Sequence, residues 1–324
     1  MAKLSTRYLG LDLRSPIIVS SGPLTQDLES LKKAEAAGAG AVVLKSIFEE
    51  QIEGEVSKHL SDNSEYLDHS SAEGFFQASY ANYYIDRYLK LLVDAKKALS
   101  IPVIASINCN RMDNWIEYAE RFQTCGADAI ELNYYPIASE ASVTGAEVDK
   151  RLMEFAKTAR KKISIPLSLK IGRNYSSLAN AIKGLDAAGI DGVVLFNRFF
   201  RPDIDIRNLK MVSMKALSSA DEYADSLRWT ALMSAEVGMD IAANTGVHSG
   251  ETAIKMLLAG AKAVEVCSVL MEKGVEEIGR MNDVISSWMD EKGYKDIPSF
   301  QGLLAQERSA EGYKWERTQF LKTI

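Results

Sequence analysis

The chain has 324 residues, of which 47% are hydrophobic and 25% are charged, a composition typical of a globular protein with a large core. A formal net charge of −6 gives no electrostatic reason to expect nucleic acid or an anionic membrane as a partner. The three cysteines and three histidines show no metal-ligand spacing. We therefore expect no metal site, no membrane span and a reduced, cytoplasmic protein.

Near the N-terminus, residues 8–13 alternate around Gly10 and predict a hairpin. After it come eight β-rich runs, each followed by a helix candidate. These predicted strands are residues 17–20, 41–44, 103–107, 129–133, 166–170, 192–196, 241–244 and 263–267.

A repeated glycine junction supports this count. Residues 37–42, Ala-Gly-Ala-Gly-Ala-Val, have counterparts at 125–130, 188–193 and 259–264, each with glycine after an amphipathic helix and before a strand. Glycine ends a helix at low cost because it readily takes the left-handed conformation. Eight β/α units predict an α/β fold, a closed (β/α)8 TIM barrel. An open doubly wound sheet is the alternative, but no G-x-G-x-x-G follows the first strand.

Three connections are longer than usual, at residues 48–80, 134–145 and 198–225. All three leave the carboxyl ends of predicted strands, the face on which barrel active sites lie. We interpret them as loops over a pocket within a single domain, residues 1–324. The last segment, about residues 294–324, is predicted to pack outside the barrel.

Two kinds of polar residue end the predicted strands. Thr245 and Gly246 end the seventh strand and Cys267 and Ser268 the eighth, positions where barrels often bind phosphate through backbone N–H groups. Turn glycines and helix caps are the plain structural alternative.

Lys45 and Lys170 each end an apolar strand, a costly position unless the charge is used. Such a lysine can stabilise a reduced flavin or form a Schiff base. It can also simply pair with a neighbouring acid such as Glu131.

Taken together, several runs of the chain resemble the class 1 dihydroorotate dehydrogenases, which are FMN-containing barrels. The resemblance extends from about residue 8 to residue 302. It rests on Ser-Pro-Ile-Ile-Val-Ser-Ser-Gly at 15–22, Leu-Lys-Ser at 44–46, Glu-Leu-Asn at 131–133 with Pro136, Leu-Lys at 169–170, Asn-Thr-Gly-Val at 244–247, Leu-Ala-Gly-Ala at 258–261, Lys-Gly-Tyr at 292–294 and Phe-Gln-Gly at 300–302.

The resemblance implies an FMN-dependent oxidoreductase acting on CH–CH groups, with dihydroorotate oxidation in pyrimidine biosynthesis as the family activity and a homodimer as the usual assembly. It places Lys170 near N1 and the C2 oxygen of the flavin and makes Asn133 and Asn197 contacts of flavin or orotate. The cofactor residues it implies are Ser20, Ser21, Gly22, Lys45, Ser46, Asn133, Lys170, Thr245, Gly246, Cys267 and Ser268.

The chain departs from the family pattern on the substrate side. Tyr134-Tyr135-Pro136 stands where the family has a catalytic Cys or Ser before the proline, and residues 69–76 do not keep the usual substrate clamp. Arg198 follows Asn197 in place of serine and is a candidate anion contact. We therefore predict Tyr135, or Tyr134, as the acid/base group, acting with Lys170 on a small carbonyl or carboxylate compound. Two tyrosines in a loop can equally serve as packing.

Two other functions fit parts of the pattern. A Schiff-base lyase or aldolase would use Lys170 as its nucleophile. A non-catalytic flavin-binding subunit would explain the loss of the substrate clamp.

Overall fold

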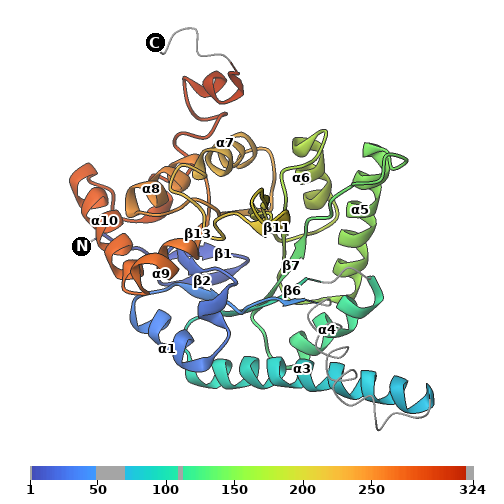
Figure 1. Ribbon diagram of the computed structural model, residues 1–324. Helices are drawn as coiled ribbons and strands as arrows, with labels where there is room; N and C mark the ends of the chain where they lie inside the picture. The colour runs from blue at the N-terminus through green and yellow to red at the C-terminus, as the bar shows by residue number, and fades with distance from the viewer. Residues whose placement is uncertain (1, 49–69, 109–111, 319–324) are drawn as a thin grey trace.

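The computed structural model describes residues 2–48, 70–108 and 112–318, with backbone only at 70–82 and 112–114. Eight parallel strands form a closed ring, in the order β4-β3-β13-β12-β9-β8-β7-β6 with β6 paired back to β4 (Figure 1). They are β3 (Ile17–Val19), β4 (Ala41–Val43), β6 (Val103–Asn108), β7 (Ala129–Tyr134), β8 (Leu167–Ile171), β9 (Gly192–Leu195), β12 (Asp240–Ala243) and β13 (Ala263–Val266). The predicted (β/α)8 barrel is confirmed.

Helices surround the ring and cover its outer face (Figure 1). Those of the described residues are α1 (Leu28–Ala36), α3 (Ser70–Ala98), α4 (Met112–Thr124), α5 (Gly145–Lys162), α6 (Leu178–Ala187), α7 (Tyr223–Met233), α8 (Gly250–Ala259), α9 (Ser268–Lys273) and α10 (Glu277–Lys292). Their ends follow local chemistry. Thr144 and Glu147 form a capping box on α5, and Gly260 ends α8 with φ 111°.

The N-terminal hairpin closes the bottom of the barrel. Strands β1 (Thr6–Tyr8) and β2 (Leu11–Leu13) pair antiparallel, as predicted from the sequence. Tyr8 and Leu9 are buried and pack against apolar residues that point inward from the strands, Ile18 and Val194 among them. The amino-terminal half of the barrel interior is therefore filled and apolar, and only the opposite end is available for a site.

The first long connection is shorter than predicted. Residues 49–69 lie outside the described part, but α3 already begins at Ser70, so the prediction of a loop as far as residue 80 is wrong. Residues 70–74 include serine and glycine, which suggest a loop, but alanines and aromatic residues follow them. The later turns of the helix pack against the protein through Ile85 and Leu92, which are buried. A short strand, β5 (Ile47–Phe48), extends the sheet beside the end of β6.

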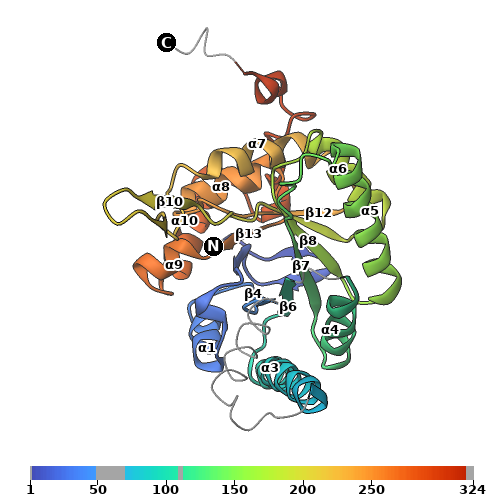
Figure 2. The same ribbon diagram turned by 45° about the vertical axis from the view of Figure 1, so that its right-hand side comes forward.

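The connection after β9 contains a hairpin of its own, β10 (Pro202–Asp205) and β11 (Lys210–Ser213). Figure 2 shows this hairpin projecting from the barrel beside α9. It places Ala216, Leu217 and Ser218 at the rim of the barrel's carboxyl end.

The last segment runs along the outside of α7 and α8. It includes the short helices η3 (Ile297–Ser299) and η4 (Gly312–Glu316). Backbone hydrogen bonds attach it, from Gly302 N to Leu257 O and from Gln306 N to Ala231 O, both 2.9 Å long. The assignment of residues 1–324 to one domain stays a prediction.

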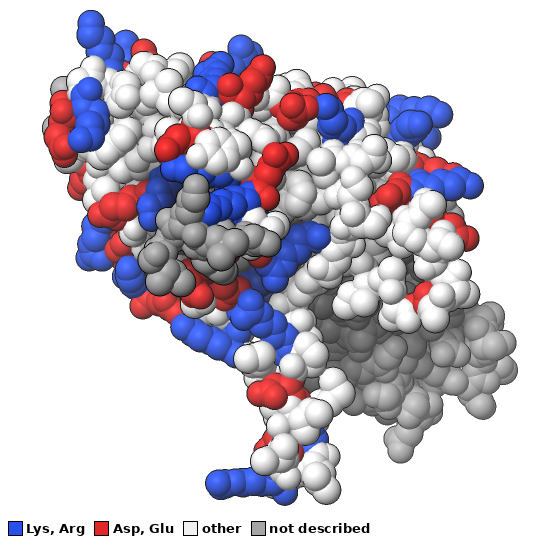
Figure 3. All heavy atoms as spheres, turned by 90° about the horizontal axis from the view of Figure 1, so that it is seen from above, with Lys and Arg blue, Asp and Glu red and all other residues white. Residues whose placement is uncertain are grey.

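The surface carries charges of both signs. On the face shown in Figure 3, basic and acidic side chains are interspersed. Within the described ranges, no helix has both the length and the hydropathy needed to cross a bilayer.

Candidate active site

A cavity of about 490 Å³ opens at the carboxyl ends of the barrel strands. Side chains alternate along a strand, so every second residue of each strand points into the barrel. Above the apolar floor these inward positions become charged and then polar. The cavity lining includes all the site residues predicted from the sequence, namely Ser20, Ser21, Gly22, Lys45, Ser46, Asn133, Tyr135, Lys170, Asn197, Arg198, Thr245, Gly246, Cys267 and Ser268.

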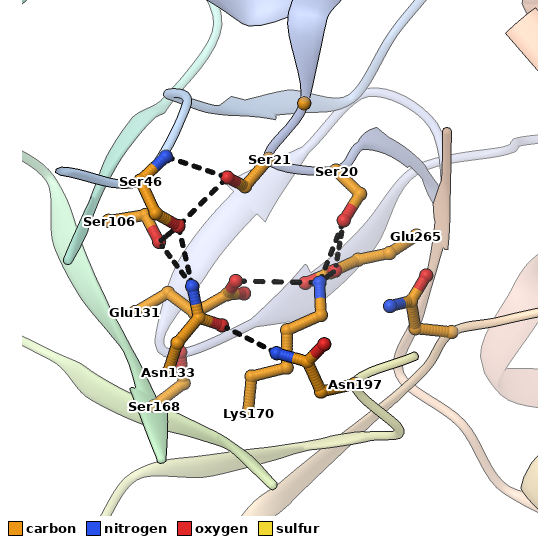
Figure 4. Close-up of polar contacts among 12 residues, drawn as sticks. Ser20, Ser21, Ser46, Ser106, Glu131, Asn133, Ser168, Lys170, Asn197 and Glu265 are labelled. Carbon is orange, nitrogen blue, oxygen red and sulfur yellow. Dashed lines mark hydrogen bonds and ion pairs between the residues drawn. The ribbon is translucent and has the colours of Figure 1, made fainter. Parts of the chain in front are cut away.

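On one side of the cavity, hydroxyl groups from three strand ends form a connected network (Figure 4). Ser46 Oγ lies 2.9 Å from Ser21 Oγ and 2.8 Å from Ser106 Oγ. Asn133 Nδ2 donates to Ser46 Oγ at 2.5 Å, and Asn197 Nδ2 donates to Asn133 Oδ1 at 3.4 Å. The network therefore fixes the orientation of the Asn133 amide at the cavity wall.

On the other side, Lys170 lies among buried acids. Its Nζ donates to Glu265 Oε2 at 2.6 Å and to Ser20 Oγ at 2.8 Å, and it lies 3.5 Å from Glu131 Oε1 (Figure 4). Lys170 is 5% exposed and the two carboxyl groups are each 1% exposed. Glu131, Lys170 and Glu265 are called the buried charge cluster below.

Electrostatics within the buried charge cluster separate the two acids. Burial and the charge of Glu265 raise the pKa of Glu131 well above its usual range, although Lys170 acts in the opposite direction. Burial also acts against ionisation of Glu265, but Lys170 and hydrogen bonds outweigh it and lower the pKa of Glu265. The two carboxylates raise the pKa of Lys170 despite its burial. Lys170 is therefore a permanent cation with Glu265 as its counter-ion.

The two other cations of the cavity differ. Arg198 is committed to the protein: its Nε donates to Glu222 Oε2 at 3.0 Å and its Nη1 to Ala216 O at 2.7 Å. Lys45 forms no ion pair with any carboxylate in the described part of the chain. Lys45 is thus the better placed of the two for a bound anion. The role of Arg198 as an anion contact stays a prediction.

Tyr134, the last residue of β7, and Tyr135, which follows it, point in opposite directions because side chains alternate along a strand. Tyr134 points away from the cavity and packs on Phe155 of α5, with ring centroids 4.5 Å apart. Tyr135 lines the cavity, accepts a hydrogen bond of 2.9 Å from Asn108 Nδ2, and lies 5.6 Å from the ring of Phe199. Of the two candidates from the sequence, only Tyr135 reaches the cavity. Its role as acid/base group stays a prediction.

Backbone conformation leaves the cavity rim open. A Cβ on Gly22 would lie 2.7 Å from Cys267 Sγ, so only glycine lets the backbone pass here. Thr245 and Gly246 both have positive φ, at 74° and 75°, and a Cβ on Gly246 would lie 2.1 Å from Tyr223 N. These turns present backbone rather than side chains to the cavity.

One functional residue was missed from the sequence. Glu265 lies inside an apolar strand, at the inward position between Ala263 and Cys267. A buried glutamate costs free energy unless it is paired, so a glutamate in this apolar run was the signal in the sequence that could have identified the residue. The substrate-clamp region at residues 69–76 begins outside the described residues, and its side chains are not described.

Comparisons with known proteins agree with this architecture. A sequence profile of the family described as dihydroorotate dehydrogenase matches residues 3–289. The catalytic subunit of dihydroorotate dehydrogenase B (NAD(+)) from Thermoplasma acidophilum is 28% identical over 94% of this chain and 99% of its own length. The corresponding subunit from Methanosarcina mazei is 30% identical over 91% of this chain and 93% of its own. A putative dihydroorotate dehydrogenase A (fumarate) from Aeropyrum pernix is 27% identical over 93% and 97%.

The match covers every strand of the barrel and all residues of the cavity. The resemblance predicted from the strand-end motifs is thereby confirmed. The chain belongs to the dihydroorotate dehydrogenase family and is an oxidoreductase of that family.

Proposed function

We propose that the protein is an FMN-dependent oxidoreductase that acts on a CH–CH or C=C bond of a small carbonyl or carboxylate compound. The observation that carries this proposal is the cavity, which gathers every cofactor residue implied by the family resemblance at one end of the barrel. Dihydroorotate remains the first candidate substrate, because the relatives are named for it.

The residues present fit a flavin mononucleotide. The cavity volume lies within the range of cofactor sites, roughly 300–1,000 Å³. Gly22 lines the cavity without a side chain of its own, and Lys170 lies in the cavity wall with its ammonium group paired to Glu265. Thr245, Gly246, Cys267 and Ser268 line one end, where backbone amides would hold the phosphate. When bound, FMN would supply hydride transfer.

Tyr135 is the group best placed to hold or donate a proton to substrate. Cys267 also lines the cavity, but burial raises the pKa of its thiol, so it remains protonated near neutral pH. The Tyr135 hydroxyl accepts a hydrogen bond from Asn108 Nδ2, which helps to hold the phenol at the cavity wall. A tyrosine suits proton donation better than proton abstraction, since its unperturbed pKa is about 10.

An absorbance spectrum of the purified protein tests the cofactor assignment. We expect flavin bands and release of one FMN per chain on denaturation. An anaerobic screen of dihydroorotate and related dihydropyrimidines for loss of the oxidised flavin band then tests the substrate class. A colourless protein that also fails to bind added FMN would refute the proposal.

A matched pair of variants tests Tyr135. Tyr135→Phe should slow the substrate-dependent flavin reaction by roughly 10²–10⁴-fold. Tyr134→Phe is the control, because Tyr134 packs on Phe155 outside the cavity and should leave the rate unchanged. Equal rates for Tyr135→Phe and the unaltered protein would show that another group handles the proton.

The structure disfavours a Schiff-base mechanism. A nucleophilic lysine must lose its proton, but the two neighbouring acids of the buried charge cluster raise the pKa of Lys170 despite its burial. Borohydride trapping of a substrate adduct on Lys170 would reverse this judgement. A flavin-binding subunit without its own substrate stays the second candidate, because residues 69–76 do not keep the family's usual substrate clamp. Flavin that no small donor reduces in the isolated chain would favour it.

We also propose a homodimer, the usual assembly of the family that the sequence resembles. The β10–β11 hairpin offers an exposed apolar surface of Ile204, Ile206, Leu209 and Met211. Such patches are uncommon on monomers. Light scattering of the purified protein, with and without Leu209→Asp, tests the assembly. The cytoplasmic location and a place in pyrimidine biosynthesis stay predictions.

A further inference from the structure

We infer that Glu131 and Glu265 hold one proton between them beneath the cavity, so that the buried charge cluster is neutral and Glu265 acts as a positioning residue for Lys170. This inference deepens the proposed function and rests on it, because Lys170 matters to the reaction only if a flavin lies above it. The proton itself can be tested without a flavin.

The count of charges is the first argument. Two carboxyl groups, each 1% exposed, lie against a single ammonium group. With both carboxyl groups ionised the cluster would carry one net negative charge in a nearly water-free interior, which is unfavourable because a buried charge without a partner loses its hydration. Binding one proton removes that charge. Glu131 Oε1 and Glu265 Oε1 are both buried without a hydrogen-bond donor among the described atoms, and a shared proton would supply one.

The distances decide which acid carries the proton. Glu265 Oε2 accepts hydrogen bonds from Lys170 Nζ at 2.6 Å and from Ser20 Oγ at 2.9 Å, so the negative charge of Glu265 is well compensated. Glu131 lies 3.5 Å from Lys170 Nζ, so its charge is compensated less. Glu131 is therefore the carboxylic acid and Glu265 the carboxylate.

Among the described residues that face the buried charge cluster, none adds a competing charge. From β1 below, Tyr8 faces the cluster, and burial, Glu265 and Glu131 raise its pKa, so the phenol stays neutral. Ser168 of β8 and Ser20 next to β3 are neutral, and Cys267 is a neutral thiol because burial raises its pKa. Asp240 influences Tyr8 but sits on the far side of it, bonded to Leu9 N at 2.7 Å.

A neutral cluster has a definite effect on a flavin. A lone lysine beneath the ring would stabilise the negative charge of the reduced flavin and raise its reduction potential. Here Glu265 Oε2 lies 2.6 Å from Lys170 Nζ and compensates its charge, so a reduced flavin bound above the cluster would be stabilised less and would be the stronger reductant. Within the proposed function, this favours the direction in which an activated C=C bond of a carbonyl or carboxylate compound is reduced over the direction in which a CH–CH bond is oxidised.

Infrared difference spectroscopy of the purified protein near neutral pH tests the proton. We expect the C=O stretch of one protonated carboxylic acid to be absent from Glu131→Gln relative to the unaltered protein. Glu265→Gln should lose it as well, because Glu131 then ionises to become the counter-ion of Lys170. Glu277→Gln, a buried glutamate of α10 that pairs with Arg280, is the control and should keep the band. A band that persists in either cluster variant would overturn the inference.

The reduction potential of the flavin tests the positioning role. Glu131→Gln should leave it unchanged, since a protonated acid is replaced by a neutral amide of the same shape. Glu131→Gln with Glu265→Gln should raise it, because Lys170 then has no counter-ion. An unchanged potential in the double variant, or a raised potential in Glu131→Gln alone, would refute the role. If the double variant does not fold, the infrared bands of the single variants decide. A colourless protein that keeps the carboxylic acid band would refute only the flavin proposal.

Discussion

Replacing Lys170 by methionine removes the cation that holds two buried carboxyl groups together. The change breaks hydrogen bonds of 2.6 Å to Glu265 and 2.8 Å to Ser20, and leaves the carboxylate of Glu265, which is 1% exposed, without a counter-ion. Removal of one partner from a buried ion pair typically costs about 3–5 kcal/mol of unfolding free energy. We expect a loss of about that size for Lys170→Met near pH 8.

The loss should depend on pH with a definite sign. Without Lys170 the pKa of Glu265 also rises in the folded protein, so both acids prefer to be protonated there. A group whose folded pKa exceeds its unfolded value of about 4.3 favours folding below that value, and this contribution is lost as pH rises. Lys170→Met should therefore be closer to the unaltered protein at about pH 5 than at about pH 8.

Urea unfolding followed by far-UV circular dichroism at both pH values measures this difference. Lys170→Met combined with Glu265→Gln is the matched variant and should recover part of the loss, because it leaves one acid that can stay neutral. A loss below about 1 kcal/mol at both pH values, or one of equal size at both, would refute the account of the buried charge cluster.

Three further predictions concern single positions. Gly22→Ala should lower the FMN content of the purified protein, because its Cβ would lie 2.7 Å from Cys267 Sγ; extraction and absorbance measure it, and full occupancy would contradict the close backbone approach. Glu131→Gln should become more stable relative to the unaltered protein as pH rises above about 4.3, by up to about 1.4 kcal/mol per pH unit. The reason is that the raised pKa of Glu131 in the folded protein disfavours its ionised form. Urea midpoints measured across pH check this, and a constant difference in midpoint between the two proteins would contradict it. Glu222→Gln should lose the stability that Glu222 gives above its unfolded pKa of about 4.3, because hydrogen bonds and the charge of Arg198 lower the folded pKa to about 2; the variant and the parent should then converge as pH falls toward that value.

Most of the fold could be predicted from the sequence because its signals are local. Each barrel strand is a short apolar run with glycine or proline at its entrance, and all eight lie where the pattern places them. The wrong prediction of a loop at residues 70–80 also came from a local signal. Serine and glycine at 70–74 suggest a loop, whereas the helix there is the start of α3, whose later turns pack through Ile85 and Leu92.

The candidate site was predicted unevenly for a geometric reason. Residues at strand ends could be identified because parallel strands all end on one face. Which side chains meet inside the ring depends on how the strands are staggered, and a linear pattern does not reveal it. Lys170 contacts Ser20 and Glu265, which are 150 and 95 residues away in the chain. Hence Glu131 was proposed as a partner of a strand-end lysine, whereas the sequence marks Glu265 only as a costly glutamate in an apolar strand and does not show that Lys170 is its partner.

Strand alternation also changes how the Tyr134-Tyr135 pair is understood. From the sequence either tyrosine could replace the family's cysteine or serine. Because β7 points Asn133 inward and Tyr134 outward, Tyr135 is the next residue to face the cavity, where Asn108 holds its hydroxyl at 2.9 Å. A phenol that is a good donor and a lysine whose charge is already cancelled both favour adding hydrogen to a substrate over removing it. Tyr135 in the loop and the ion-paired Lys170 in the barrel interior thus favour the same direction of the proposed reaction.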